Sequence, residues 1–165
     1  MMVNTSKILA EVSLFAKVLD EDQLERLALR CHEVFFPAGA VMMTEGDFGT
    51  SMFVVVEGEV SVGLADKHGG VHDVAKLSAG EFVGEMSLMT GARRNADVVA
   101  ETDVVAIEIT KVALEEILRQ APDLIDQFGL VLAWRQAELD RTAAEVAEAN
   151  KDDLVSQIRR FFGGG

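Results

Sequence analysis

The sequence of 165 residues has little of what several classes of protein require. Its one cysteine, Cys31, cannot form a disulfide within the chain, so a reducing cytoplasm is the natural compartment. No apolar run reaches the length of a membrane-spanning helix, and the N-terminus lacks the apolar segment of a signal peptide. These absences predict a soluble, cytoplasmic chain.

Positive charge is scarce as well. Fifteen lysines and arginines stand against 28 aspartates and glutamates, which gives a formal net charge of −13. Nucleic acids and anionic membrane surfaces are both recognised largely through basic residues. The charge therefore argues against general nucleic-acid binding and against adhesion to a membrane surface.

Histidine is too sparse for the usual metal sites of β-rich enzymes. The chain has only His32, His68 and His72, and no His-x-His pair. A cupin-like metalloenzyme needs clustered histidine and carboxylate ligands on its strands. We keep such an enzyme only as an alternative, and expect no bound metal and no enzyme activity.

The composition that remains is that of a globular domain. Hydrophobic residues make up 49% of the chain and charged residues 26%, and the length is sufficient for a sizeable core. Apolar residues at helical spacing predict N-terminal helices within residues 1–32, the first over 6–19 and the second from Asp20 or Asp22. In the second helix we expect three leucines to face inward: Leu24, Leu27 and Leu29.

From residue 33 to residue 110 the pattern changes to short β-rich runs, separated by turns that contain glycine or proline. Regularly spaced short strands are typical of a barrel or a jelly roll. The predicted fold class is therefore α+β, with an antiparallel, jelly-roll-like β-roll flanked by helices. The expected strands are residues 33–36, 41–44, 52–57, 59–64, 72–77, 96–100 and 104–110.

Helical periodicity returns at Lys111 and is interrupted at Pro122, where a new helix is expected to begin and to continue to about Asn150. A last short helix is expected from Asp153 to Phe162, before a glycine tail. The chain thus divides into N-terminal helices, a β-roll, a hinge with a long helix, and a short C-terminal helix with its tail. The corresponding ranges are 1–32, 33–110, 111–150 and 151–165.

Residues 82–98, FVGEMSLMTGARRNADV, carry the clearest chemistry. Gly84 and Glu85 open a short apolar turn, Gly91 ends it, and Arg93 and Arg94 follow. Free N–H groups of a helix start, together with a guanidinium, can bind one small anion. Glu85 would repel phosphate alone, but it can accept a hydrogen bond from a ribose hydroxyl. A ligand with both a phosphate and a ribose is a nucleotide.

This segment resembles the phosphate-binding cassette of cyclic nucleotide-binding domains, the family of bacterial catabolite activators, kinase regulatory subunits and cyclic nucleotide-gated channels. The resemblance continues through PAG at 37–39, EGDFG at 45–49 and MFVVVEGEVSVG at 52–63, and reaches about Leu139. It implies a regulatory domain that binds cAMP or cGMP, with Arg94 on the phosphate and Glu85 on the ribose 2′-hydroxyl. The nucleotide-binding residues that it implies are Gly84, Glu85, Met86, Ser87, Arg94, Asn95, Ala96 and Arg135.

Arg135 enters this set through a stripe on the long helix. The stripe consists of residues spaced alternately three and four apart: Ile125, Phe128, Leu132, Arg135, Leu139, Thr142 and Val146. In the family the final helix closes over the base, and an ungapped count from Arg94 brings the lid position of channel members to Arg135. Val83 and Trp134 are candidate base contacts. The alternative stays open that Trp134 packs on the roll while Arg135 reaches solvent.

The cassette departs from the family pattern at three positions. Asn95 stands where Ala, Ser or Thr is usual, Asp97 where Thr, Ser or Asn is usual, and Val83 where an aromatic residue is frequent. The charge of Asp97 would oppose phosphate unless the side chain points away. The usual ligand of family members with bacterial-looking sequences, together with the absence of threonine at position 95, favours cAMP over cGMP.

The cassette and the IRRFF ending look most like the cytoplasmic C-terminal domain of bacterial cyclic nucleotide-gated channels. That likeness implies attachment to a membrane channel and allows a homo-oligomer. DNA-binding regulators of the catabolite-activator kind carry a further helix-turn-helix module, for which the 15 residues after Asn150 are too few. A non-catalytic interaction or oligomerisation module with a vestigial pocket is the main alternative.

Overall fold

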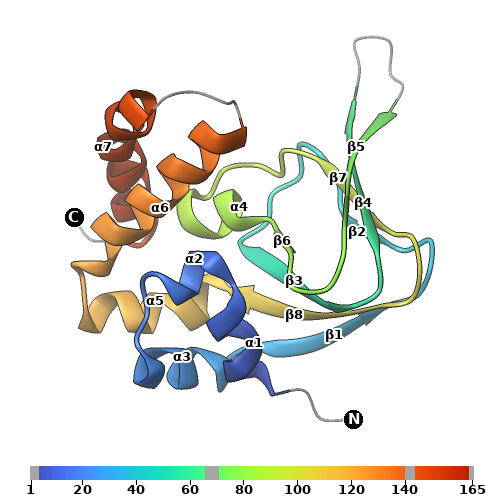
Figure 1. Cartoon of the computed structure of the whole chain (residues 1–165), viewed down its shortest axis with the longest axis horizontal. Helices are drawn as coiled ribbons and strands as arrows, with labels where there is room; N and C mark the ends of the chain where they lie inside the picture. The colour runs from blue at the N-terminus through green and yellow to red at the C-terminus, as the bar shows by residue number, and fades with distance from the viewer. Residues whose placement is uncertain (1–3, 66–70, 140–143, 164–165) are drawn as a thin grey trace.

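The computed structural model describes residues 4–65, 71–139 and 144–163. Figure 1 shows a β-roll on one side and helices on the other, with the short helix α4 between them. The predicted α+β class is confirmed, with two antiparallel four-stranded sheets. None of the described helices is long and apolar enough to cross a membrane.

The N-terminal region contains α1 (Thr5–Glu11), α2 (Ser13–Ala16) and α3 (Glu21–Ala28). The single helix expected over residues 6–19 is interrupted at Val12, which is extended with ψ of 118° and has a buried side chain. Helix α3 begins as predicted, because Asp20 and Gln23 form a capping box at its start.

One of the three leucines that were expected to face inward does not. Leu24 and Leu27 are buried, but Leu29 is 86% exposed. A helix turns by about 100° per residue, so position 29 lies about 140° around the axis from position 24. The helix also ends at Ala28, and Leu29 therefore lies at its exposed C-terminal cap.

Two sheets form the roll, with the strand orders β1-β8-β3-β6 and β2-β7-β4-β5. All seven predicted strands are present, with boundaries shifted by no more than a residue or so. The two-residue strand β6 was not predicted, because a run this short carries no periodicity. The strands are β1 (His32–Phe36), β2 (Val41–Met43), β3 (Ser51–Glu57), β4 (Val60–Ala65), β5 (Val71–Leu77), β6 (Phe82–Val83), β7 (Asp97–Ala100) and β8 (Val104–Thr110).

Strand β3 explains how the roll is joined to the helices. Side chains alternate between the two faces of a strand. Met52 and Val54 pack into the core shared with the helices, whereas Phe53 and Val55 pack into the core of the roll. All four side chains are buried, which is why the strand is apolar on both faces from Met52 to Val55.

The C-terminal helices differ from the prediction. They are α5 (Lys111–Gln120), α6 (Leu124–Leu139) and α7 (Ala144–Phe161). The predictions of one helix from Pro122 to about Asn150 and of a separate short helix from Asp153 were wrong. Residues 144–161 form one helix, which packs side by side with α6 (Figure 1). Gly129 of α6 permits the close approach, since a Cβ atom there would overlap Cγ2 of Val155.

The stripe on α6 is confirmed where the structure describes it. Ile125, Phe128 and Leu132 are buried, and Arg135 is partly exposed. The side chain of Leu139, together with Thr142 and the side chain of Val146, lies outside the described residues.

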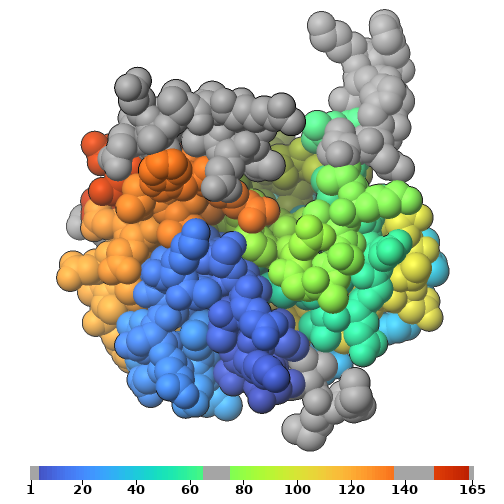
Figure 2. All heavy atoms as spheres, in the orientation of Figure 1, coloured from blue at the N-terminus to red at the C-terminus, as the bar shows by residue number. Residues whose placement is uncertain are grey.

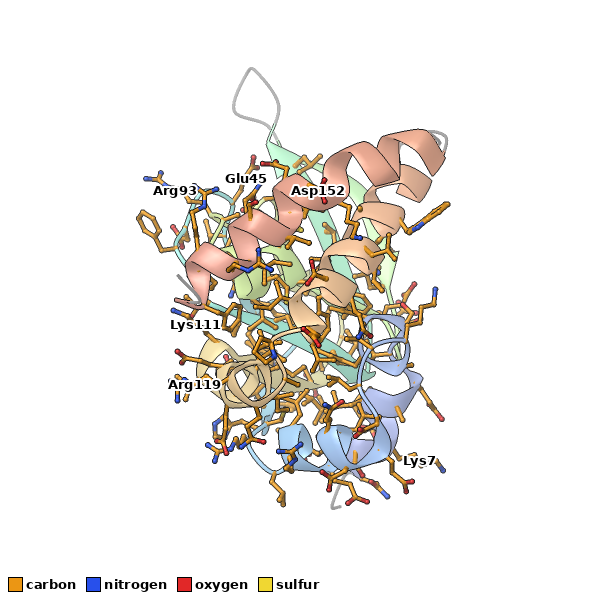
Figure 3. All side chains as sticks on the ribbon, turned by 90° about the vertical axis from the view of Figure 1, so that its left-hand side faces the viewer. Lys7, Glu45, Arg93, Lys111, Arg119 and Asp152 are labelled. Atoms are coloured by element: carbon orange, nitrogen blue, oxygen red, sulfur yellow. The ribbon has the colours of Figure 1, made fainter. Side chains whose placement is uncertain are left out.

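Helix α7 also reaches the cassette. Its C-terminal end lies against α4, where a Cβ atom at Gly91 would overlap the Phe161 ring. Lys111 lies beside this end of α7 (Figure 3), with its Nζ atom 4.3 Å from the centroid of the Phe161 ring. The last helix is therefore packed against both α6 and the segment expected to bind phosphate.

Candidate functional site

Gly84 joins β6 to the cassette helix α4 (Glu85–Thr90) in a conformation that favours glycine, with φ of +88°. Space is restricted there too. A Cβ atom at this position would lie 2.8 Å from Nη1 of Arg94 and 2.9 Å from the carbonyl oxygen of Ser51. The glycine therefore lets the start of α4 approach the Arg94 guanidinium directly.

Arg94 is buried, with only 8% of its surface exposed. Its Nη1 donates to the Ser51 carbonyl oxygen at 2.5 Å, and Nη2 donates to Ser51 Oγ at 3.3 Å. Desolvation lowers the pKa of Arg94, while the nearby Glu108 carboxylate acts in the opposite direction. Arginine nonetheless remains charged in proteins. The result is a fixed cation in a poorly hydrated position beside the cassette, where an anion is strongly stabilised.

The loop between β2 and β3, which carries the EGDFG sequence, holds the Arg94 backbone. The Arg94 N–H donates to the Asp47 carbonyl, and the Gly46 N–H donates to the Arg94 carbonyl, both at 2.8 Å. Gly49 lies against the guanidinium, since a Cβ atom there would come within 2.6 Å of Cζ. This sequence therefore forms a cover over the arginine.

Arg93 faces the other way. It is exposed and lies on the periphery (Figure 3), with its guanidinium carbon 4.5 Å from the centroid of the Phe48 ring. Neighbouring arginines thus have opposite environments, and only Arg94 is enclosed by the cassette and its covering loop.

Glu85, at the first position of α4, contacts the helix that was expected to act as a lid. Its Oε1 lies 3.4 Å from Nε of Arg135, and the Arg135 guanidinium carbon is 4.1 Å from the centroid of the Phe82 ring. Although Nε is buried, it has no hydrogen-bond partner among the described residues. The ion pair is therefore a loose electrostatic contact. Arg135 does not simply reach into solvent.

The other predicted site residues surround these two centres. Met86 is partly buried beside the helical core, Ser87 is 3% exposed, and Ala96 is 7% exposed. Asn95 is exposed next to Arg94. Val83 is buried in the core of the roll, whereas Trp134 is 42% exposed and lines a cavity between α2 and α6.

Ser51 was not predicted, although it binds both terminal nitrogens of Arg94. One of its two acceptors is a backbone carbonyl, which any residue type supplies. The only available signal was its position at the start of an apolar strand, directly after the EGDFG loop and Thr50.

Comparison with known proteins decides the family. The model of the cyclic nucleotide-binding domain family matches residues 33–121, which is more than half of the chain. This chain belongs to the cyclic nucleotide-binding domain family.

Similar members of the family have different outputs. A cyclic nucleotide-gated potassium channel of Rhizobium etli is 36% identical over 125 residues, covering 75% of this chain and 33% of the channel. A CRP-like cAMP-activated global transcriptional regulator of Mycobacterium tuberculosis is 24% identical, covering 93% of this chain and 67% of the regulator. The chain therefore spans about a third of the length of that channel.

A solved structure supports the fold. The N-terminal domain of a transcriptional regulator from Streptomyces coelicolor A3(2) superimposes with a TM-score of 0.69 at 28% identity. The match covers 81% of this chain and 93% of that chain. The likeness therefore extends well beyond the cassette, over most of both chains.

The structure explains one departure from the cyclic nucleotide-binding pattern. Oδ1 of Asp97 accepts a hydrogen bond of 2.7 Å from the Glu45 backbone N–H. The carboxylate is thus engaged by the same loop that covers Arg94. This hydrogen bond holds the loop at the start of β7.

Proposed function

We propose that the chain is a regulatory domain that senses cAMP, with cGMP as the alternative ligand. The observation that carries the proposal is the buried Arg94 guanidinium beside Gly84, in the cassette whose first helical residue is Glu85. A desolvated cation and a carboxylate acceptor on one short segment match a cyclic phosphate and a ribose hydroxyl. No catalytic step is required of these residues.

In this proposal Arg94 pairs with the phosphate and Glu85 accepts from the ribose 2′-hydroxyl. Gly84, Met86, Ser87, Asn95 and Ala96 complete the cassette wall, and Val83 and Trp134 remain candidate base contacts. Asn95 is exposed directly after Arg94, where its amide can donate to a phosphate oxygen. We expect neither a metal nor another cofactor to take part.

The contact between Glu85 and Arg135 suggests how binding is sensed. A ribose hydroxyl on Glu85 competes with Arg135 for the carboxylate, and the released guanidinium can turn to the base. Helix α6 would then adjust its position on the cassette. Because α7 packs on both α6 and α4, we expect the two helices to respond together. A coupling of about 1–3 kcal/mol is typical of such equilibria.

The effector is proposed from the relatives. The cyclic nucleotide-gated potassium channel of Rhizobium etli favours attachment to a membrane channel, and the transcriptional regulator offers a different output. Within this proposal the domain lies on the cytoplasmic face of the channel and takes part in a homo-oligomer. An interaction module with a vestigial pocket is the second candidate. The buried charge on Arg94 argues against it, because a vestigial pocket has no need for a desolvated cation.

Calorimetric titration with cAMP, cGMP and 5′-AMP tests the proposal, with Arg93→Ala as the matched control for Arg94→Ala. We expect one site for a cyclic nucleotide, and a loss at Arg94→Ala of about 2–5 kcal/mol, since the bound anion loses its buried cation. Arg93→Ala should change the affinity less than about threefold, as expected for an exposed charge. Circular dichroism establishes that each variant is folded. Equal losses at both arginines, or no binding of either cyclic nucleotide to folded wild-type protein, would contradict the proposal.

A further inference from the structure

A cavity of about 380 Å³ lies between α2, α6 and the strand β6, apart from the Arg94 centre. In Figure 2 the blue N-terminal helices, the orange α6 and the light-green cassette region meet on the face toward the viewer. Neither Glu85 nor Arg94 lines the cavity. Its size is within the range of small-molecule sites.

The wall combines an apolar interior with a cationic rim. Leu14, Val18 and Phe82 are each at most 8% exposed, and Trp134 is partly exposed at the edge. Such a wall suits the hydrocarbon or aromatic body of a ligand.

The charge of this wall is opposite to that of the chain. Among the described residues the ionisable groups that line the cavity are Lys17 and Arg135, with no carboxylate, although the whole chain has a net charge of −13. Lys17 is exposed and forms no ion pair within the described part of the chain. Nε of Arg135 is buried without a hydrogen bond. Two cations with spare bonding capacity favour an anionic group at the rim.

We propose that this cavity is a second ligand site, which binds a small carboxylate with an apolar body. The carboxylate lies between Lys17 and Arg135, and the apolar body packs on Phe82, Leu14 and Trp134. This site is additional to the proposed cyclic nucleotide site: it contains neither Glu85 nor Arg94, but it shares Arg135 and Trp134 with the base contacts proposed there, so it is tested on nucleotide-free protein.

Trp134 provides a specific reporter, because it is the only tryptophan and the chain has no tyrosine. Octanoate is titrated into nucleotide-free protein while the emission of Trp134 is recorded, with 1-octanol as the neutral control and octylammonium as the cationic control. We expect one saturable shift for octanoate, with half-saturation at roughly 0.1–1 mM. The alcohol and the amine should bind at least about tenfold more weakly, because neither offers an anion.

Lys17→Gln and Lys7→Gln form a matched pair, since both remove an exposed lysine from an N-terminal helical segment and only Lys17 lines the cavity. Lys17→Gln should raise the half-saturating octanoate concentration about three- to tenfold, and Lys7→Gln should leave it within about 1.5-fold. Ser13→Phe, which fills the cavity from an exposed position, should abolish the shift. Equal binding of octanoate and octanol, equal effects of the two lysine changes, or an unchanged shift in Ser13→Phe would overturn the proposal. None of these outcomes depends on whether cAMP binds elsewhere.

Discussion

Adding one methyl group at Gly49 probes how the buried guanidinium of Arg94 is held. The backbone of Gly49 does not have a positive φ, so alanine can adopt it without strain. Its Cβ atom would lie 2.6 Å from both Cζ and Nη2 of Arg94. Ordinary carbon contacts are about 3.5–4.0 Å, so the guanidinium has to move by about 1 Å.

That movement removes the bonds between Arg94 and Ser51. Hydrogen bonds from a charged donor contribute about 1.5–3 kcal/mol each, which for two bonds sets an upper limit of about 6 kcal/mol. One of the two is already long at 3.3 Å, and water can replace part of the loss. Alanine also restricts the unfolded chain more than glycine does, which stabilises the fold by about 0.4–1 kcal/mol. We expect Gly49→Ala to lower the free energy of unfolding by about 2 kcal/mol and the melting temperature by about 4–8 °C.

The same displacement should weaken cAMP binding about 10- to 100-fold, because a shift of about 1 Å misplaces the phosphate ligand. Calorimetric titration and thermal unfolding are measured on Gly49→Ala, Arg94→Ala and the double variant. In the Arg94→Ala background the added methyl group should reduce neither the free energy of unfolding nor the cAMP affinity, since the guanidinium that it would displace is absent. Neutral behaviour of Gly49→Ala in the wild-type background, or an equal loss in both backgrounds, would show that the methyl group does not act through Arg94.

Three further predictions concern residues outside the Arg94 centre. Asp97→Ala should destabilise the fold by about 1 kcal/mol in chemical denaturation, because the Glu45 N–H loses its acceptor, while Asp97→Asn should be nearly neutral. A tenfold gain in cAMP affinity in either variant would instead place the Asp97 charge near the phosphate. Gly129→Ala and Val155→Ala should each reduce the free energy of unfolding, and the loss in the double variant should be smaller than the sum of the two losses by at least about 0.5 kcal/mol. Strictly additive losses would mean that α6 and α7 do not meet at these two residues. Burial raises the pKa of the Cys31 thiol from 9.0 to about 12, so the stabilisation from the neutral thiol is fully present below pH 9 and is lost as the pH rises toward 12. The thiol should also react slowly with a disulfide reagent at pH 8, and a Cys31→Ala variant with the same alkaline decline in stability would contradict this origin.

The β-roll could be predicted because its signals are local. Gly39, Gly46, Gly58 and Gly80 mark turns at positive φ, and the runs between them have the length and composition of strands. The end of α6 could not be predicted in this way. No glycine or proline stands between residues 139 and 144, and the alanine- and glutamate-rich stretch that follows favours a continuous helix. Tertiary packing of α7 on α6, which local propensity does not encode, decides the outcome.

The resemblance to the cassette singled out Arg94, and not Arg93, as the expected phosphate ligand, and in the structure Arg94 is buried while Arg93 is exposed. The contacts that enclose Arg94 were not predicted, because they come from Ser51, 43 residues earlier in the chain. The pairing of Arg135 with Glu85 was also missed. Sequence spacing placed Arg135 on the same stripe of α6 as the buried Phe128 and Leu132, but its partner there depends on how closely the helix approaches the cassette.

The most direct test of cyclic nucleotide recognition is the coupling between Glu85 and the ribose 2′-hydroxyl. Calorimetry on wild-type protein and Glu85→Gln, each with cAMP and with 2′-deoxy-cAMP, gives this coupling free energy from four affinities. We expect Glu85→Gln to weaken cAMP binding by about 1–3 kcal/mol, because it removes the charge-assisted hydrogen bond to the 2′-hydroxyl. It should have almost no effect on binding of the deoxy ligand, which lacks that hydroxyl and never forms the bond. A coupling close to zero, with cAMP binding intact, would mean that Glu85 does not bind the ribose and that the cassette does not hold the nucleotide as proposed.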